Sequence, residues 1–225
     1  MFKNILQVFL ILTISFIAYA GGAGQWSDDG RPGQTMRVPK DHEFKVCADP
    51  NNLPFSNKKL EGFENKIAEV LAKDLNMELS FQFWPDRFGF IRNTIKAQRC
   101  DVLIGTGSAV DMVKTSKPYY RSGHVWIYRK DSGFNIKDWN SPDLRKGIIG
   151  IVDKSPVAVA LNENDLMANA RPYRLMRDLT KDPGQLVNHL VEGEIDIAIM
   201  WGPIGGYFAK KSSVPMEVVL IPEFE

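Results

Sequence analysis

From about residue 44 to residue 83, apolar residues recur at the regular spacings typical of strands and helices. The run 44–48 (FKVCA) predicts a strand that ends at the turn-forming residues 49–54 (DPNNLP). Residues 63–75 carry apolar side chains at helical spacing, which predicts a helix with one buried face. In residues 79–83 (LSFQF), strict alternation predicts a half-buried strand.

A second helix and a third strand complete this part of the pattern. Phe88, Ile91 and Ile95 recur at helical spacing, and residues 101–104 (DVLI) predict a buried strand that ends at 105–108 (GTGS). The order strand, helix, strand, helix, strand is typical of a parallel sheet with helices on both faces.

The same order recurs in the second half of the chain. Strands are expected at 147–152, 171–176 and 195–200, and helical patterns at 156–161 and 186–191. The fold class is therefore α/β, with two lobes of mostly parallel sheet, flanking helices and a cleft between the lobes.

Each half carries an aspartate between a helix and a buried strand, namely Asp101 and Asp196. We expect these carboxylates to accept hydrogen bonds from backbone N–H groups at the strand entries.

Residues 124–129 (HVWIYR) alternate as a strand that could cross from one lobe to the other. In open α/β sheets, ligands bind beyond the carboxyl ends of the strands, so the loops after the strands should face the cleft. These loops are 49–55, 84–87, 105–108, 153–156 and 201–203.

The amino terminus has the pattern of a cleaved export signal. Lys3 precedes the apolar residues 5–17, and the small-x-small sequence 18–20 (AYA) follows. A membrane anchor is the alternative, but the apolar run is shorter than the roughly 20 residues that span a bilayer. We therefore expect a periplasmic protein that does not span the membrane.

The charge and the cysteine content of the chain limit the kinds of function that it could have. The full chain has 28 basic and 27 acidic residues, so it offers no general field for nucleic acid. Cys47 and Cys100 fall in an exported chain, on strands expected to be neighbours, which favours a disulfide over two buried free thiols. No histidine or second cysteine stands beside either one to complete a metal site.

Large apolar residues stand around the predicted opening of the cleft, where aromatic side chains are favoured as interface anchors. They are Phe55, Trp84, Tyr119, Tyr120, Trp201 and Pro203. The cleft could thus receive a protein segment or an apolar compound. The alternative is that Trp84 and Trp201 plug the cleft or pack in the hinge.

Five polar residues are also candidates for the cleft. Asp49 and Asn52 could orient a ligand, although both are ordinary turn residues. Thr106 and Ser108 belong to a glycine-containing loop whose N–H groups could bind an anion. Arg121 follows two tyrosines near the expected crossover, where it would face the cleft or form a hinge salt bridge.

Several motifs carry a resemblance to a known family. They are 47–57 (CADPNNLPFSN), 62–65 (GFEN), 89–94 (GFIRNT), 100–102 (CDV), 118–122 (PYYRS) and 201–203 (WGP). They resemble the consensus of the quinoprotein-dehydrogenase-associated binding proteins, the MoxJ/MxaJ and XoxJ family of methanol oxidation, over residues 44–208. The resemblance implies a periplasmic type II binding-protein fold and a non-catalytic role in maturing a quinoprotein methanol or alcohol dehydrogenase.

A more distant resemblance links the chain to the amino-acid receptors of ABC uptake systems. Those receptors hold the substrate carboxylate with an arginine and the ammonium with an aspartate. The corresponding positions here carry Ala109 and Trp201, so free amino acids should not bind. A receptor for another small molecule remains the alternative function.

The resemblance also sets an expected domain organisation. It comprises a signal peptide (1–20), a flexible lead-in (21–41), a first lobe (42–122), a crossover strand (123–130) and a second lobe (131–225). Type II binding proteins return to the first lobe after the second, and the sequence shows no such return before Glu225. Either the sequence is a fragment or its first lobe is trimmed.

The histidines do not form a catalytic pattern. His42, His124 and His189 stand apart in the sequence and match no nucleophile, acid–base or metal motif. Glu192 and Glu194 are typical of a solvated helix end. We therefore expect no catalytic residue, no cofactor and no metal.

Overall fold

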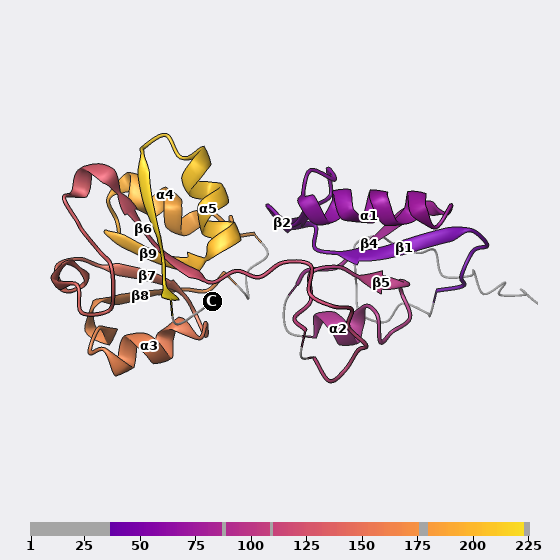
Figure 1. Cartoon of the computed structure of the whole chain (residues 1–225), viewed down its shortest axis with the longest axis horizontal. Helices are drawn as coiled ribbons and strands as arrows, with labels where there is room; N and C mark the ends of the chain where they lie inside the picture. The colour runs from indigo at the N-terminus through magenta and orange to yellow at the C-terminus, as the bar shows by residue number, and fades with distance from the viewer. Residues whose placement is uncertain (1–36, 87–88, 109, 176–179, 223–225) are drawn as a thin grey trace, which may run out of the picture.

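Two lobes and a segment that connects them make up the computed structural model (Figure 1). The structure describes residues 37–86, 89–108, 110–175 and 180–222. We call residues 110–123 the connecting segment, and they lie in neither helix nor strand. The expected signal peptide lies outside the described residues.

The first lobe is built on a parallel three-stranded sheet in the order β4-β1-β5. Its strands are β1 (Glu43–Ala48), β4 (Glu78–Phe83) and β5 (Val102–Leu103). A two-stranded hairpin, β2 (Asn51–Asn52) and β3 (Ser56–Asn57), follows β1. The parallel order predicted from the hydrophobic pattern is confirmed.

Helix α1 (Phe63–Asp74) covers one face of this sheet, where Ala68 and Ala72 pack against Phe44 and Val46. Small alanines let the helix approach the strands closely, which buries the apolar side chains of β1. Helix α2 (Phe90–Asn93) lies on the opposite face (Figure 1).

The second predicted helix ends earlier than the apolar spacing from 88 to 95 suggested, and Phe88 itself lies outside the described residues. Gly89 has a φ of 87°, and the chain leaves helical geometry at Thr94, with a φ of −116° and a ψ of −94°. The Thr94 hydroxyl donates to the carbonyl of Phe90 at 2.6 Å. This local hydrogen bond competes with continuation of the helix.

The second lobe contains a mixed five-stranded sheet in the order β10-β6-β9-β7-β8. Its strands are β6 (His124–Arg129), β7 (Ile149–Val152), β8 (Ala170–Tyr173), β9 (Ile197–Trp201) and β10 (Met216–Leu220). Strand β7 pairs in parallel with β8 and β9, whereas β6 pairs antiparallel with β9 and β10. This sheet is therefore less parallel than the sequence pattern suggested.

Helices cover both faces of the second sheet (Figure 1). They are α3 (Val157–Glu163) on one face, and α4 (Gln185–Glu192) and α5 (Gly202–Lys211) on the other. Short 3-10 turns at Lys130–Ser132, Pro142–Arg145 and Met167–Asn169 join the elements.

Alternate residues of the central strands serve the two cores of the second lobe. Trp126 and Ile199 belong to the cluster that includes Leu161 of α3, whereas Ile127 and Ala198 join the cluster that includes Leu190 of α4. Successive residues of a strand point to opposite faces of the sheet, and helices cover both faces of this sheet. Every buried residue of β6 and β9 is therefore apolar.

The expected crossover at 123–130 differs from the structure. All of β6 pairs with β9 and β10 inside the second sheet, so the chain passes between the lobes in the connecting segment before it. The alternating pattern of 124–129 identifies a strand but does not identify its partners, which are more than 65 residues away in β9 and more than 85 in β10.

Cys47 and Cys100 form a disulfide with an S–S distance of 2.04 Å, which confirms the pairing favoured from the sequence.

Arg37, in the expected flexible lead-in, is buried and pairs with Glu43 and Asp101 at 2.8 Å each. These two ion pairs fix the end of the lead-in to the first lobe.

Candidate functional site

A cavity of about 180 Å³ lies at the carboxyl ends of the strands of the second lobe. It is bounded by residues from both lobes, namely Asn51, Asn52, His124, Val152, Ser155, Leu175, Lys181, Pro183, Ile199, Met200, Trp201 and Ile204. Three of the loops expected to face the cleft contribute to it, through Asn51 and Asn52, through Ser155 and through Trp201. The cavity thus occupies the place where open α/β sheets bind ligands.

The cavity lining is apolar with a few polar groups. Lys181 is exposed, and no carboxylate is among the described residues that line the cavity. The Ser155 hydroxyl is buried and has no hydrogen-bond partner within the part of the chain that the structure describes. Burial lowers the pKa of His124, which favours a neutral imidazole at this wall. The lining therefore suits an uncharged or anionic group better than an ammonium group.

Trp201 ends β9 at the edge of the cavity, opposite His124 in the sheet. Their rings meet edge to face, with centroids 5.5 Å apart. Burial and the charge of Glu64 raise the pKa of Tyr120 in the connecting segment, and the nearby Trp201 indole partly offsets this rise. Trp201 therefore lies close to the segment that enters the second lobe.

Tyr120 also belongs to an aromatic cluster of the first lobe. Its ring centroid lies 6.5 Å from that of Phe55 and 5.9 Å from that of Phe63, and Phe55 is buried. Tyr119 stacks at an angle against Tyr120 at 5.2 Å and is 51% exposed. Phe55, Tyr119 and Tyr120 thus form one aromatic cluster between the first lobe and the connecting segment.

Glu64 belongs to the junction of the lobes, although it was not predicted from the sequence as a site residue. It lies in the first turn of α1, is 9% exposed, and accepts a hydrogen bond from the Tyr119 hydroxyl at 3.3 Å. Burial, reinforced by the nearby carboxylates of Asp86 and Asp49, raises the pKa of Glu64 to about 7. Burial and the charge of Glu64 also raise the pKa of Tyr119.

The loop after β5 makes room for this carboxylate. Gly105 has a φ of +85°, and a Cβ atom at this position would overlap the carboxylate oxygens of Glu64. Only glycine adopts this φ readily and also leaves room for the carboxylate, so Gly105 allows Glu64 to be buried against the loop. The sequence carries no local signal for this contact, because Glu64 and Gly105 come from distant segments that meet only in the folded lobe.

Asp49 has a structural role in the first lobe. Its carboxylate accepts hydrogen bonds from the backbone N–H groups of Asn51 and Asp86, and its carbonyl accepts from the Ser56 hydroxyl at 2.9 Å. These bonds tie the hairpin to the loop after β4. Asp49 therefore shapes the mouth as a turn residue, whereas its neighbour Asn52 lines the cavity.

Trp84 does not line the cavity. The guanidinium of Arg99 lies over its ring, 4.8 Å from the centroid, and Arg99 is buried. Burial lowers the pKa of Arg99, because the charged guanidinium loses hydration. The Trp84 ring therefore packs against Arg99 within the first lobe.

The other residues predicted for the cleft are not among those that line the cavity. Thr106 is half-buried, whereas Ser108 is exposed and accepts a hydrogen bond from the Thr115 hydroxyl through its carbonyl at 3.1 Å. Arg121 is exposed, and Pro203 is half-buried in the first turn of α5, next to cavity residue Ile204. Ala109 lies outside the described residues.

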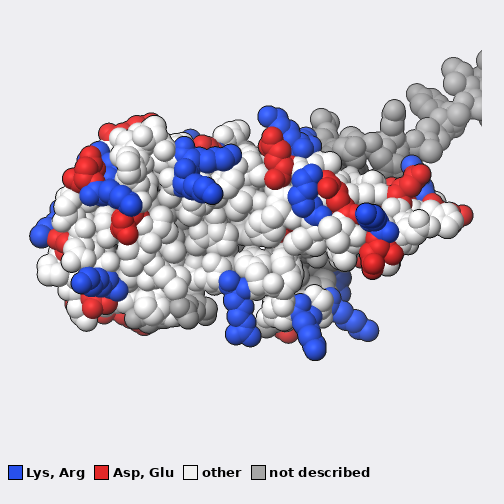
Figure 2. Space-filling model, turned by 45° about the horizontal axis from the view of Figure 1, so that its top comes forward, with Lys and Arg blue, Asp and Glu red and all other residues white. Residues whose placement is uncertain are grey.

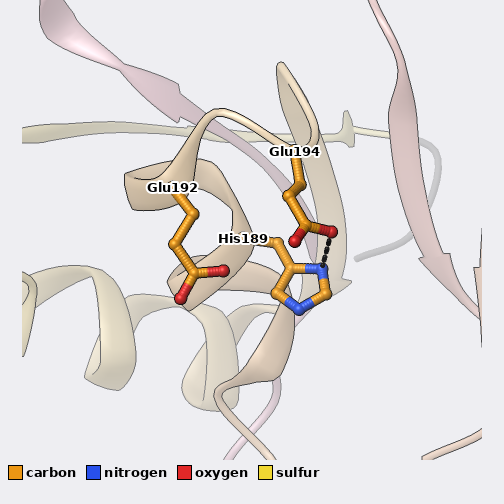
Figure 3. A group of neighbouring side chains, drawn as sticks. All are labelled: His189, Glu192 and Glu194. Atoms are coloured by element: carbon orange, nitrogen blue, oxygen red, sulfur yellow. Dashed lines mark ion pairs between the residues drawn. The ribbon is translucent and has the colours of Figure 1, made fainter.

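One group of side chains within the described ranges has the composition of a metal site, His189, Glu192 and Glu194 at the end of α4 (Figure 3). Glu194 pairs with Arg171 at 2.9 Å and with His189 at 3.3 Å, and the Tyr173 hydroxyl meets His189 Nδ1 at 2.7 Å. A metal would have to displace these contacts. We therefore interpret the group as a polar network that fastens β8 to α4.

Within the described residues, no helix combines the length and apolarity needed to cross a membrane. Residues 44–190 match the family model of the bacterial extracellular solute-binding proteins, family 3.

Curated relatives extend this match. Protein MoxJ of Paracoccus denitrificans is 29% identical over 190 residues, and Protein MoxJ of Methylorubrum extorquens is 28% identical over 194 residues. The alignments cover 79% and 80% of this chain, and 68% and 63% of the two relatives. The chain thus spans about two thirds of the length of these relatives.

Solved structures share the same architecture. The periplasmic binding protein XoxJ from Methylobacterium extorquens AM1 is 36% identical, with a TM-score of 0.66, and MxaJ from Methlophaga aminisulfidivorans MPT is 35% identical, with a TM-score of 0.69. Each match covers 79% of this chain and 77% of the solved chain. The predicted type II binding-protein fold and the resemblance to MoxJ, MxaJ and XoxJ are confirmed.

Proposed function

We propose that this chain, which belongs to the bacterial extracellular solute-binding proteins, family 3, is a periplasmic, non-catalytic accessory factor of a quinoprotein alcohol dehydrogenase. The likeness to XoxJ and MxaJ at 36% and 35% identity carries the proposal. The motifs of the two lobes resemble proteins of methanol oxidation, in which such a factor would help to mature or maintain the dehydrogenase.

The chemistry of the junction supports a protein partner. Trp201 and Tyr120 are large amphipathic side chains that bring together the second lobe and the connecting segment. Aromatic residues of this kind are frequent anchors at protein interfaces, because they bury much surface at little entropic cost. Since no carboxylate lines the described cavity wall, the ammonium group of an amino acid would lack a charged partner there.

Crosslinked co-purification tests the proposal. The tagged protein is expressed in the periplasm of a methanol-oxidising bacterium, crosslinked mildly and recovered for mass spectrometry. We expect a quinoprotein dehydrogenase subunit with the wild type and a several-fold lower yield with Trp201→Ala. Tyr207→Ala, which truncates a half-buried aromatic residue on the same helix as the cavity residue Ile204, serves as the control.

The outcome separates two functions. Recovery of the dehydrogenase at equal yield from all three proteins would exclude a role for the junction, and recovery of none would contradict the proposal. A permease together with a bound metabolite would instead support a receptor of an ABC-type uptake system. The cavity of about 180 Å³ is the observation that favours this second function.

A further inference from the structure

Positive charge is concentrated in one stretch of the chain, which runs from α2 into the connecting segment, although the whole chain is nearly neutral. Five exposed cations lie between residues 92 and 121, and we call them the basic strip: Arg92, Lys96, Lys114, Lys117 and Arg121. None of the five forms an ion pair within the described part of the chain. These charges are therefore not neutralised by neighbouring carboxylates.

Acidic groups are few in the same stretch. Asp111 is exposed, whereas the carboxylate of Asp101 pairs with Arg37 and accepts a hydrogen bond from the backbone of Lys45. Figure 1 places α2 on the face of the first sheet away from α1, on the lower side of this lobe. Figure 2 shows Lys and Arg side chains projecting from the lower side of the molecule, with little Asp or Glu between them.

Exposed apolar side chains are interleaved with the basic strip. Met112 is 45% exposed, Tyr119 51% and Tyr120 38%, and all three lie in the connecting segment. Methionine, aromatic residues and arginine are enriched at protein interfaces, where a few buried anchors provide most of the binding energy. An isolated basic surface would attract any polyanion, but this combination favours a folded protein with an acidic face.

We propose that the basic strip and its apolar anchors form the docking surface for an acidic face of the partner protein. This inference rests on the proposed function, so the partner is the quinoprotein dehydrogenase. The cations would steer the acidic face toward the connecting segment, and Met112 would be buried on contact. Because the Tyr119 hydroxyl donates a hydrogen bond to Glu64, a partner bound here would lie beside the junction of the lobes.

Binding of the full chain to the purified dehydrogenase, measured by biolayer interferometry at low and high salt, tests the inference. Lys114→Glu with Lys117→Glu should slow association about tenfold at low salt, and the loss should shrink at high salt as charges are screened. The control is Lys58→Glu with Lys59→Glu, which makes the same charge change at two exposed lysines before α1. Circular dichroism checks that each variant is folded.

Met112→Ala tests the apolar anchors separately from the basic strip, because this substitution changes no charge. It should speed dissociation with little effect on association, since a truncated anchor acts mainly on the off-rate. Equal kinetics for the wild type, the Lys114→Glu with Lys117→Glu variant and Met112→Ala would overturn the inference while leaving the proposed function intact. Failure of the wild type to bind the dehydrogenase would overturn the proposed function itself, and binding only to anionic phosphatidylglycerol vesicles would replace the protein partner with a membrane.

Discussion

The hydroxyl of Tyr119 donates a hydrogen bond of 3.3 Å to Oε1 of Glu64, which joins the connecting segment to the first turn of α1. Glu64 is buried beside two further acidic residues, Asp86 and Asp49, and its pKa is raised to about 7. The junction of the lobes therefore contains an acid that changes charge near neutral pH.

This pKa makes the stability of the protein depend on pH in a defined direction. Because the folded-state pKa of about 7 exceeds the reference value of 4.5, the folded protein binds the extra proton between these values. The stabilising contribution is complete below pH 4.5 and is lost as the pH rises through 7. Glu64→Gln should therefore raise the free energy of unfolding by roughly 1–3 kcal/mol at pH 8, relative to wild type.

Urea unfolding at pH 5 and pH 8 measures this effect. The gain from Glu64→Gln should be clearly smaller at pH 5, where the wild-type carboxyl is mostly protonated. Glu69→Gln on the exposed side of the same helix is the control and should show little pH dependence. A pH-independent effect of Glu64→Gln would mean that the carboxyl does not titrate in this range.

The close approach of Gly105 to Glu64 predicts an unusually costly substitution. Gly105→Ala adds strain at a φ of +85° and forces a methyl group into the Glu64 carboxylate, so we expect a loss of about 3 kcal/mol or more. Gly133→Ala carries similar strain at a φ of +74° but meets no atom within 4 Å, and should cost about 1 kcal/mol. Similar losses of unfolding free energy in the two variants would show that the contact with Glu64 is not restrictive.

The disulfide between Cys47 and Cys100 should contribute substantially to the stability of the first lobe. It closes a loop with a sequence separation of 53 residues, for which restriction of the unfolded chain provides roughly 4 kcal/mol. Guanidinium unfolding of Cys47→Ala with Cys100→Ala should show a loss of about 2–4 kcal/mol. A loss below about 1 kcal/mol would contradict a stabilising role for this bond.

Free amino acids should not stabilise the protein. The described wall of the cavity offers Lys181 but no carboxylate for an ammonium group. A ligand at 100 times its dissociation constant stabilises by about 2.7 kcal/mol, which raises the melting temperature by several degrees. Thermal-shift measurements with millimolar amino acids should show no such rise, and a clear rise with any one of them would reinstate the amino-acid receptor.

Local chemistry was predictable from the sequence where it depends on neighbouring backbone. Asp101 accepts from Lys45 N at 2.7 Å and Asp196 from Ile148 N at 2.8 Å, as expected for aspartates at strand entries. The parallel pairing of β1 with β4 and β5 follows from the hydrophobic periods, and it places Cys47 next to Leu103, near Cys100.

Contacts between distant segments could not be predicted in the same way. The burial of Glu64 depends on α1, the loop at Gly105 and Tyr119 meeting in space, although a glutamate early in a helix normally faces solvent. Likewise, the alternation in β6 specified a strand but not its antiparallel partners. Trp84 was assigned to the cleft from its place after β4, whereas its ring packs against Arg99.

The specific activity of the periplasmic quinoprotein dehydrogenase in a strain that lacks this protein tests the accessory role most directly. We predict less active enzyme per mole of dehydrogenase in the deletion strain, restored by the wild-type gene and restored only partly by the Trp201→Ala variant. Unchanged specific activity after deletion, with growth on alcohol also unchanged, would contradict the account.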